Sequence, residues 1–205
     1  MRISEIMNSY GISDVRDIAP TIVSGPTLET RPKILAELKK QGISTVVDFR
    51  GGDQPLLRNV CEEIDITYRN FDFNHAISSG GKTISQPANF IDELKKFFGI
   101  MNKGNAYIGC EYGIHRTNAA LVYNHILNNP DGTRFATPQL FTINGDGDIN
   151  SIINFLSRKV WKTIKLMTDE EKKFFNLTGT KRELFNNFII KKVGELKQNA
   201  SKILL

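Results

Sequence analysis

The stretch "NAYIGCEYGIHRTNAALVYNHIL", residues 105–127, contains Cys110 and, six positions later, Arg116. A short apolar run precedes the cysteine, and a run with helical spacing begins at Thr117. A strand, a loop and a helix in this order aim successive backbone N–H groups at one point beside a helix N-terminus, which suits a phosphate dianion. Gly113 stands in mid-loop, where a tight turn needs a positive φ or a close backbone approach. The segment therefore predicts a phosphate-binding loop.

Three side chains of this loop could act on a bound phosphate. Arg116 could hold two phosphate oxygens in a bidentate fork, which a lysine cannot do. The helix N-terminus and the arginine would favour the thiolate form of Cys110, which is the nucleophilic form. Thr117 could donate a hydrogen bond to the sulfur and ease its departure from phosphorus. Together these residues indicate phosphoryl transfer through a cysteine.

Helices and strands alternate along the first 130 residues, which predicts an α/β fold with a central, mostly parallel sheet and helices on both faces. Reactive residues of such folds lie beyond the C-terminal ends of the strands, where Cys110 is expected. The expected elements are a helix from 34, a strand at 44–49 ended by Gly51-Gly52, a helix at 55–63, a strand at 64–71, a helix at 89–102, a strand at 105–110 and a helix at 117–129.

The chain after Asn150 is expected to be helical throughout, at 152–166, 169–175 and 181–197. We therefore divide the sequence into a catalytic domain at 1–150 and a basic helical extension at 151–205 that packs on the same domain. Asp148 is expected to cap the first of these helices. An apolar stripe at helical spacing should dock the last helix on the core: Leu184, Phe185, Phe188, Ile189, Val193 and Leu196.

The net charge of +5 is unevenly distributed. Residues 158–205 hold 12 Lys/Arg against 5 Asp/Glu, whereas the rest of the chain is slightly acidic. A basic helical segment can serve an acidic partner such as a membrane surface or nucleic acid, although it can also be an ordinary solvated face. No apolar run reaches the roughly 18 residues of a membrane span, so no integral membrane segment is expected. The N-terminus lacks a secretory signal, and two cysteines suit a reducing, cytoplasmic setting.

At the cysteine loop the chain resembles the cysteine-dependent protein tyrosine phosphatase superfamily, whose loop reads His-Cys-x5-Arg-Ser/Thr, and within it the compact dual-specificity and atypical members. The resemblance covers about residues 20–130. "TIVSGPTLETRPKILAELKKQGISTVVDFRGG" is similar to the family's opening strand, helix and buried strand, and "IDITYRNFDFN" is similar to the strand and loop that carry its general acid.

The resemblance implies a two-step reaction without metal or cofactor. Cys110 would attack phosphorus and form a cysteinyl phosphate, while Arg116 and the loop amides stabilise the equatorial oxygens. Asp72, 38 residues before the cysteine, would be the general acid and then the base, with His75 as the alternative. Asp48 is expected to pair with Arg50 or a backbone amide instead. The loop residues implied to contact the substrate phosphate are Glu111, Tyr112, Gly113, Ile114 and His115.

Three positions depart from the family's pattern. Gly109 replaces the histidine before the cysteine, which in the family orients the loop; a glycine would allow tighter packing beneath it. Glu111 adds a carboxylate beside the nucleophile, and we expect this side chain to point to solvent. His115 makes the ending "GIHRT" similar to the Gly-x-Asn-Arg-Thr of the RNA 5′-triphosphatase branch, so it could contact substrate or fix the loop internally.

The leading prediction is a dual-specificity or tyrosine protein phosphatase acting on phosphorylated proteins. A phospholipid, an inositol phosphate or an RNA 5′-phosphate is the second class of substrate. A silent phosphate-binding protein, or pseudophosphatase, is the alternative outside enzymes, and Gly109 is its best support. "VVDFRGG" is also similar to a strand end of rhodanese-like domains, but their later glycine-rich stretch is missing here. Cys61 is either an ordinary buried cysteine or a disulfide partner for Cys110.

Overall fold

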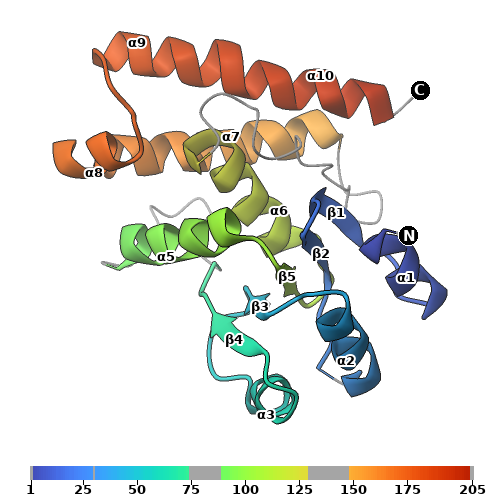
Figure 1. Cartoon of the computed structure of the whole chain (residues 1–205). Coiled ribbons are helices and arrows are strands. Elements are labelled where there is room, and N and C mark those ends of the chain that lie inside the picture. The colour runs from blue at the N-terminus through green and yellow to red at the C-terminus, as the bar shows by residue number, and fades with distance from the viewer. Residues whose placement is uncertain (1, 30, 74–88, 129–147, 204–205) are drawn as a thin grey trace.

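The computed structural model describes residues 2–29, 31–73, 89–128 and 148–203 (Figure 1). His75 and the last residue of the helix expected at 117–129 lie outside the described residues. Five strands form one sheet in the order β1-β2-β5-β3-β4, in which only β1 is antiparallel to its neighbour. The strands are β1 (Arg16–Ala19), β2 (Ile22–Pro26), β3 (Thr45–Asp48), β4 (Thr67–Asn70) and β5 (Ala106–Cys110).

The register of the parallel strands brings their C-terminal ends to one edge of the sheet. β5 lies in the centre, where Gly109 is opposite Gly25 of β2 and opposite Asp48 of β3. Cys110 is opposite Pro26, the last residue of β2. The expected position of the cysteine at a strand end is therefore confirmed.

Helices cover both faces of the sheet, as the alternating pattern predicted (Figure 1). The core divides into two clusters, one on each face. Helices α2 and α3 both begin with a proline at the first turn, where its missing N–H costs nothing. One face of the sheet is covered by α1 (Ile3–Ser9), α2 (Pro32–Lys40) and α3 (Pro55–Glu63). The other face is covered by α5 (Phe90–Lys103) and α6 (His115–Tyr123), and α6 continues into the π-helical segment η1 (Asn124–Asn128).

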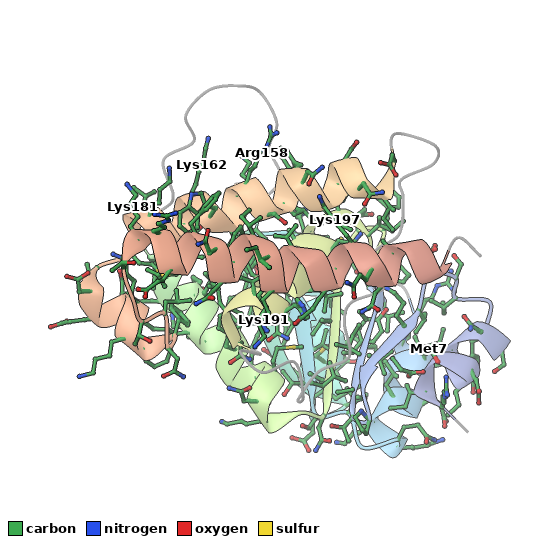
Figure 2. All side chains as sticks on the ribbon, turned by 90° about the horizontal axis from the view of Figure 1, so that it is seen from above. Met7, Arg158, Lys162, Lys181, Lys191 and Lys197 are labelled. Atoms are coloured by element: carbon green, nitrogen blue, oxygen red, sulfur yellow. The ribbon has the colours of Figure 1, made fainter. Side chains whose placement is uncertain are left out.

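The C-terminal helices pack beyond α5 and α6, and α7 and α10 lie side by side in both views (Figures 1 and 2). Ile153, Leu156 and Val160 belong to the same core cluster as α5 and α6. A division of the chain at residue 150 remains a prediction. Among the described residues, no helix combines the length and apolar character that a bilayer span requires. The elements are α7 (Ile149–Leu166), α8 (Asp169–Phe174), α9 (Lys181–Asn186), the π-helical segment η2 (Asn187–Val193) and α10 (Gly194–Ile203).

Two expectations for these helices need correction. Phe188, Val193 and Leu196 are buried as expected, but Phe185 and Ile189 are 43% and 40% exposed. Ile189 lies in η2, where π-helical hydrogen bonding adds a residue to the turn, so the apolar stripe loses its α-helical phase there. Phe185 lies before η2, in α9, and its ring packs against that of Trp161 at a centroid distance of 5.1 Å. Asp148 does occupy the N-cap position of α7, but its side chain makes no capping hydrogen bond.

Candidate active site

The segment from β5 to α6 forms the loop that the sequence predicted. Cys110 ends β5 and is almost completely buried, and the Gly113 N–H donates to its carbonyl oxygen at 3.3 Å, closing a tight turn. Gly113 has a φ of +70°, the conformation for which a glycine was expected. Helix α6 then begins at His115, with its first hydrogen bond from Asn118 N to Ile114 O at 2.9 Å. The strand, loop and helix needed to bind an anion are therefore present.

The loop packs tightly against the end of β2. A Cβ atom on Gly113 would lie 2.6 Å from the Gly25 carbonyl oxygen, a separation that side chains do not adopt. The Thr27 N–H donates to the Glu111 carbonyl oxygen at 3.3 Å. The glycine at 113 is thus required both by its backbone conformation and by this close approach.

A buried arginine that the sequence analysis missed supports the loop from β1. Arg16 is only 4% exposed; its Nη1 donates to Asn118 Oδ1 at 2.7 Å and its Nη2 to the Gly113 carbonyl oxygen at 2.5 Å. Burial lowers the pKa of Arg16 to about 10, and the negative charge of the Cys110 thiolate opposes this fall. Arg16 therefore stays cationic at neutral pH, with its positive charge beside Cys110.

The glycine before the nucleophile has a steric explanation. A Cβ atom on Gly109 would lie 2.6 Å from the Gly25 carbonyl oxygen, so a histidine does not fit without displacing β2. Tyr107 lies on the same face of β5 two residues earlier, and its hydroxyl donates to the Pro26 carbonyl oxygen at 2.5 Å. Burial raises the pKa of Tyr107, which keeps this hydroxyl a hydrogen-bond donor. Tyr107 and Arg16 thus provide polar support under the loop.

Arg116 and Thr117 lie in the first turn of α6. Arg116 is partly buried, and its Nη1 donates to the Phe49 carbonyl oxygen at 3.4 Å, just past the end of β3. This contact holds the guanidinium at the edge of the sheet where Cys110 lies. Thr117 is completely buried, but its hydroxyl makes no hydrogen bond to any described residue. The hydrogen bond expected from Thr117 to the Cys110 sulfur is therefore not present in this structure.

The remaining loop side chains form the described rim of the site. Glu111 is half exposed, and its Oε2 lies 3.6 Å from Nη1 of Arg50, so it reaches solvent but also an ion-pair partner. Tyr112 is 61% exposed, and its ring faces that of His115 edge-on at a centroid distance of 6.3 Å. Burial and the charge of Arg116 lower the pKa of His115, which is therefore neutral at pH 7. Ile114 is partly buried at the N-cap position of α6.

Arg50 is held beside this rim by an acidic network. Asp48 is buried at the end of β3 and accepts from the Arg50 backbone N–H at 2.9 Å and from its Nη2 at 2.7 Å. Glu29 accepts from Nη1 of the same arginine at 2.6 Å. The expectation that Asp48 pairs with Arg50 is confirmed, because both oxygens of the Asp48 carboxylate accept hydrogen bonds from Arg50.

Asp72 lies just past the end of β4, at the same edge of the sheet as the loop. Its side chain is exposed and lies over the turn after β3, since a Cβ atom on Gly51 would be 3.0 Å from its Oδ1. β4 is two strands from β5, about 10 Å at the usual strand spacing. Two other aspartates upstream of Cys110 form ion pairs elsewhere: Asp65 pairs with Lys39 at 3.1 Å before β4, and Asp92 pairs with Lys95 on α5.

The two cysteines do not meet. Cys61 and Cys110 are both free thiols and belong to different core clusters, on opposite faces of the sheet. The disulfide considered from the sequence is not formed in this structure. Within the described part of the chain, no group of three His, Cys, Asp or Glu side chains is arranged to hold a metal ion.

Comparison with known proteins gives a match in structure only. No family model matches the sequence, and no curated protein matches it. TpbA from P. aeruginosa superposes with a TM-score of 0.51 at 17% identity, over 82% of this chain and 92% of TpbA. A DUF442 protein from Shewanella putrefaciens, assigned as a phosphatase, superposes with a TM-score of 0.50 at 12% identity, over 80% of this chain and 96% of its own. The core catalytic domain of the PP-IP phosphatase SIW14 from S. cerevisiae is less similar, with a TM-score of 0.43 at 14% identity over 93% of each chain. The chain therefore shares the fold of TpbA and of the DUF442 protein.

Proposed function

We propose that this protein is a phosphatase that hydrolyses phosphomonoesters through a phosphocysteine intermediate. One observation carries the proposal: Cys110 ends a central strand, a tight turn with Gly113 at positive φ follows, and Arg116 stands in the first turn of the next helix. This arrangement provides a nucleophile, a cradle of amides and a bidentate cation at one point. The fold shared with known phosphatases supports the same reading.

Each step of the proposed reaction uses residues of this chain. The Cys110 thiolate attacks phosphorus and forms an S–P bond while the P–O bond to the leaving group breaks. Asp72 gives its proton to the leaving oxygen, then takes a proton from the water that attacks phosphorus and breaks the S–P bond. Phosphate leaves and the thiolate is restored. Arg116 and the loop amides stabilise the equatorial oxygens throughout. A reducing compartment such as the cytoplasm suits a reaction that needs a free thiolate.

For the substrate we propose phosphorylated proteins, with activity on phosphotyrosine and on phosphoserine or phosphothreonine. The described rim supports this choice, because the exposed Tyr112 and the half-exposed Glu111 can contact a peptide on either side of the phosphate. A panel of phosphopeptides, phosphoinositides, inositol phosphates and triphosphorylated RNA tests it, each with the Cys110→Ser variant as background. If a non-protein member of the panel is hydrolysed faster than the phosphopeptides, that compound class becomes the proposed substrate in place of phosphorylated proteins.

A silent phosphate-binding protein had its best support in Gly109. The contact of a Cβ atom at that position with the Gly25 carbonyl oxygen now gives the glycine a packing reason. Phosphate release from a soluble aryl phosphate separates the two functions. We expect Cys110→Ser to abolish turnover and Cys61→Ser, the matched change at the other buried cysteine, to retain it. Equal rates of phosphate release for wild type and Cys110→Ser would exclude the proposed phosphatase function.

A further inference from the structure

A groove lies between α7, α8 and α9, away from the cysteine loop. Its volume is about 760 Å³. Four lysines from three different helices line it: Lys165 of α7, Lys172 and Lys173 of α8, and Lys181 of α9. Its apolar part consists of Trp161, Ile164, Leu177 and Leu184. We call it the lysine groove.

The lysine groove has an excess of positive charge. One lining residue, Asp169, is acidic, and it pairs with Lys172 at 3.3 Å. Lys165, Lys173 and Lys181 are exposed and form no ion pair with a described residue. Their charges are therefore available to an anion, and a phosphate is the common biological anion that several ammonium groups can share.

The positive charge continues along α7. Arg158, Lys162 and Lys165 follow one another at helical spacing and so share one face of the helix. Figure 2 shows Arg158 and Lys162 on the same side of the paired helices as Lys181, whereas Lys191 lies on the other side. This row spans about 10 Å at 1.5 Å per residue. It is longer than one phosphate, so it fits a surface that carries many anionic groups better than a single free anion.

Exposed apolar side chains accompany this basic row. Leu166 is 68% exposed next to Lys165 at the end of α7. Phe185 is 43% exposed, and its ring lies 5.1 Å from that of Trp161. Lysines with exposed leucine and aromatic side chains are the combination that binds at the headgroup level of an anionic bilayer. An RNA strand would use the lysines but has no comparable use for Leu166.

The ends of the groove are fixed by reciprocal helix caps. Thr168 caps α8 with Glu171, and Thr180 caps α9 with Glu183, each through a hydrogen bond in both directions. These caps fix the starts of α8 and α9, and Lys181 directly follows the Thr180 cap. We propose that the lysine groove and the adjoining face of α7 dock the protein on a membrane surface by binding the phosphate headgroups of anionic lipids.

Vesicle co-sedimentation tests the proposal. The wild-type protein should bind phosphatidylcholine vesicles containing about one-quarter phosphatidylserine, should not bind phosphatidylcholine alone, and should be released as salt is raised. Each lysine near an anionic surface contributes about fivefold to partitioning, so the double variant Lys165→Gln/Lys181→Gln should bind roughly 30-fold more weakly. The matched control Lys33→Gln/Lys103→Gln removes the same charge from exposed lysines outside the groove and should bind like wild type.

A second pair of variants distinguishes a membrane from a soluble polyanion. Leu166→Gln should weaken vesicle binding, whereas Leu56→Gln, at a leucine of similar exposure on α3, should not. Circular dichroism and thermal unfolding check that each variant is folded. Because the assay measures binding to vesicles, its result does not depend on the proposed phosphatase activity. The proposal is overturned if vesicles are not bound, if the groove and control variants bind alike, or if single-stranded RNA shows the lysine dependence and vesicles do not.

Discussion

Replacing Arg16 by lysine keeps the buried positive charge but cannot keep both hydrogen bonds of the guanidinium. Arg16 donates from two nitrogens to two acceptors, the Gly113 carbonyl and the Asn118 side chain, and both acceptors are buried. The hydrogen-bond donors of a lysine side chain are all on one nitrogen, so a lysine should reach only one of the two acceptors. A hydrogen bond from a charged donor contributes about 1.5–3 kcal/mol, so Arg16→Lys should lower the free energy of unfolding by about that amount.

The same change should reduce catalysis more than it reduces the folded fraction. Gly113 is in the middle of the loop, so a shift of its carbonyl moves the backbone amides that we propose bind the phosphate. A misplacement of about 1 Å can cost about 100-fold in rate, and we expect kcat/KM for an aryl phosphate to fall 10- to 100-fold. The affinity for vanadate should fall in parallel, because vanadate binds the same amides.

Urea unfolding and steady-state kinetics, measured where the variant is more than about 99% folded, test this reasoning. Arg69→Lys is the control, since Arg69 is exposed on β4 and makes one long hydrogen bond, at 3.4 Å, to a backbone carbonyl. It should change the free energy of unfolding by less than about 0.5 kcal/mol. If Arg16→Lys retains wild-type kcat/KM and vanadate affinity, Arg16 does not position the loop. A loss of stability alone would mean that its role is purely structural.

Three further changes have defined outcomes. Gly109→Ala should lower the free energy of unfolding in urea by about 1–3 kcal/mol through overpacking against the Gly25 carbonyl, and a stability equal to wild type would show that β2 yields easily. Asp72→Asn should slow an alkyl phosphate about 100-fold or more while largely sparing an activated aryl phosphate, with Asp65→Asn as the control; equal effects on both esters would assign the proton to another residue. Burial, with the charges of Asp48 and Glu62, raises the pKa of Cys61 to about 12, so its thiol is protonated at every pH below that range. Iodoacetate at pH 7 should therefore modify Cys110 and leave Cys61, as peptide mass spectrometry would reveal, and preferential labelling of Cys61 would contradict this.

Local patterns were sufficient to predict the fold class and the loop. The helix expected at 55–63 has those bounds, and β5, the turn at Gly113 and the start of α6 follow from the strand, glycine and helix signals of one short segment. The expected Asp48–Arg50 pair is also local, with one residue between its members.

Contacts between distant segments could not be predicted in the same way. Arg16 lies 97 residues before Gly113, and β1 was not assigned from the sequence. In the structure, burial alternates along β1, and Arg16 shares the inward face with Ile18. The reason for Gly109 depends on its register with Gly25, which no local pattern gives. The π-helical turn of η2, which contains the exposed Ile189, has no clear sequence signal either.

Trapping the covalent intermediate tests the phosphatase mechanism most directly. The protein is mixed with an aryl phosphate, quenched in acid within the first turnovers, digested and examined by mass spectrometry for phosphate on cysteine. We predict phosphate on the peptide that contains Cys110, none on the peptide that contains Cys61, and none in the Cys110→Ser variant. Turnover of the ester without phosphate on Cys110, or phosphate on another residue, would contradict the mechanism.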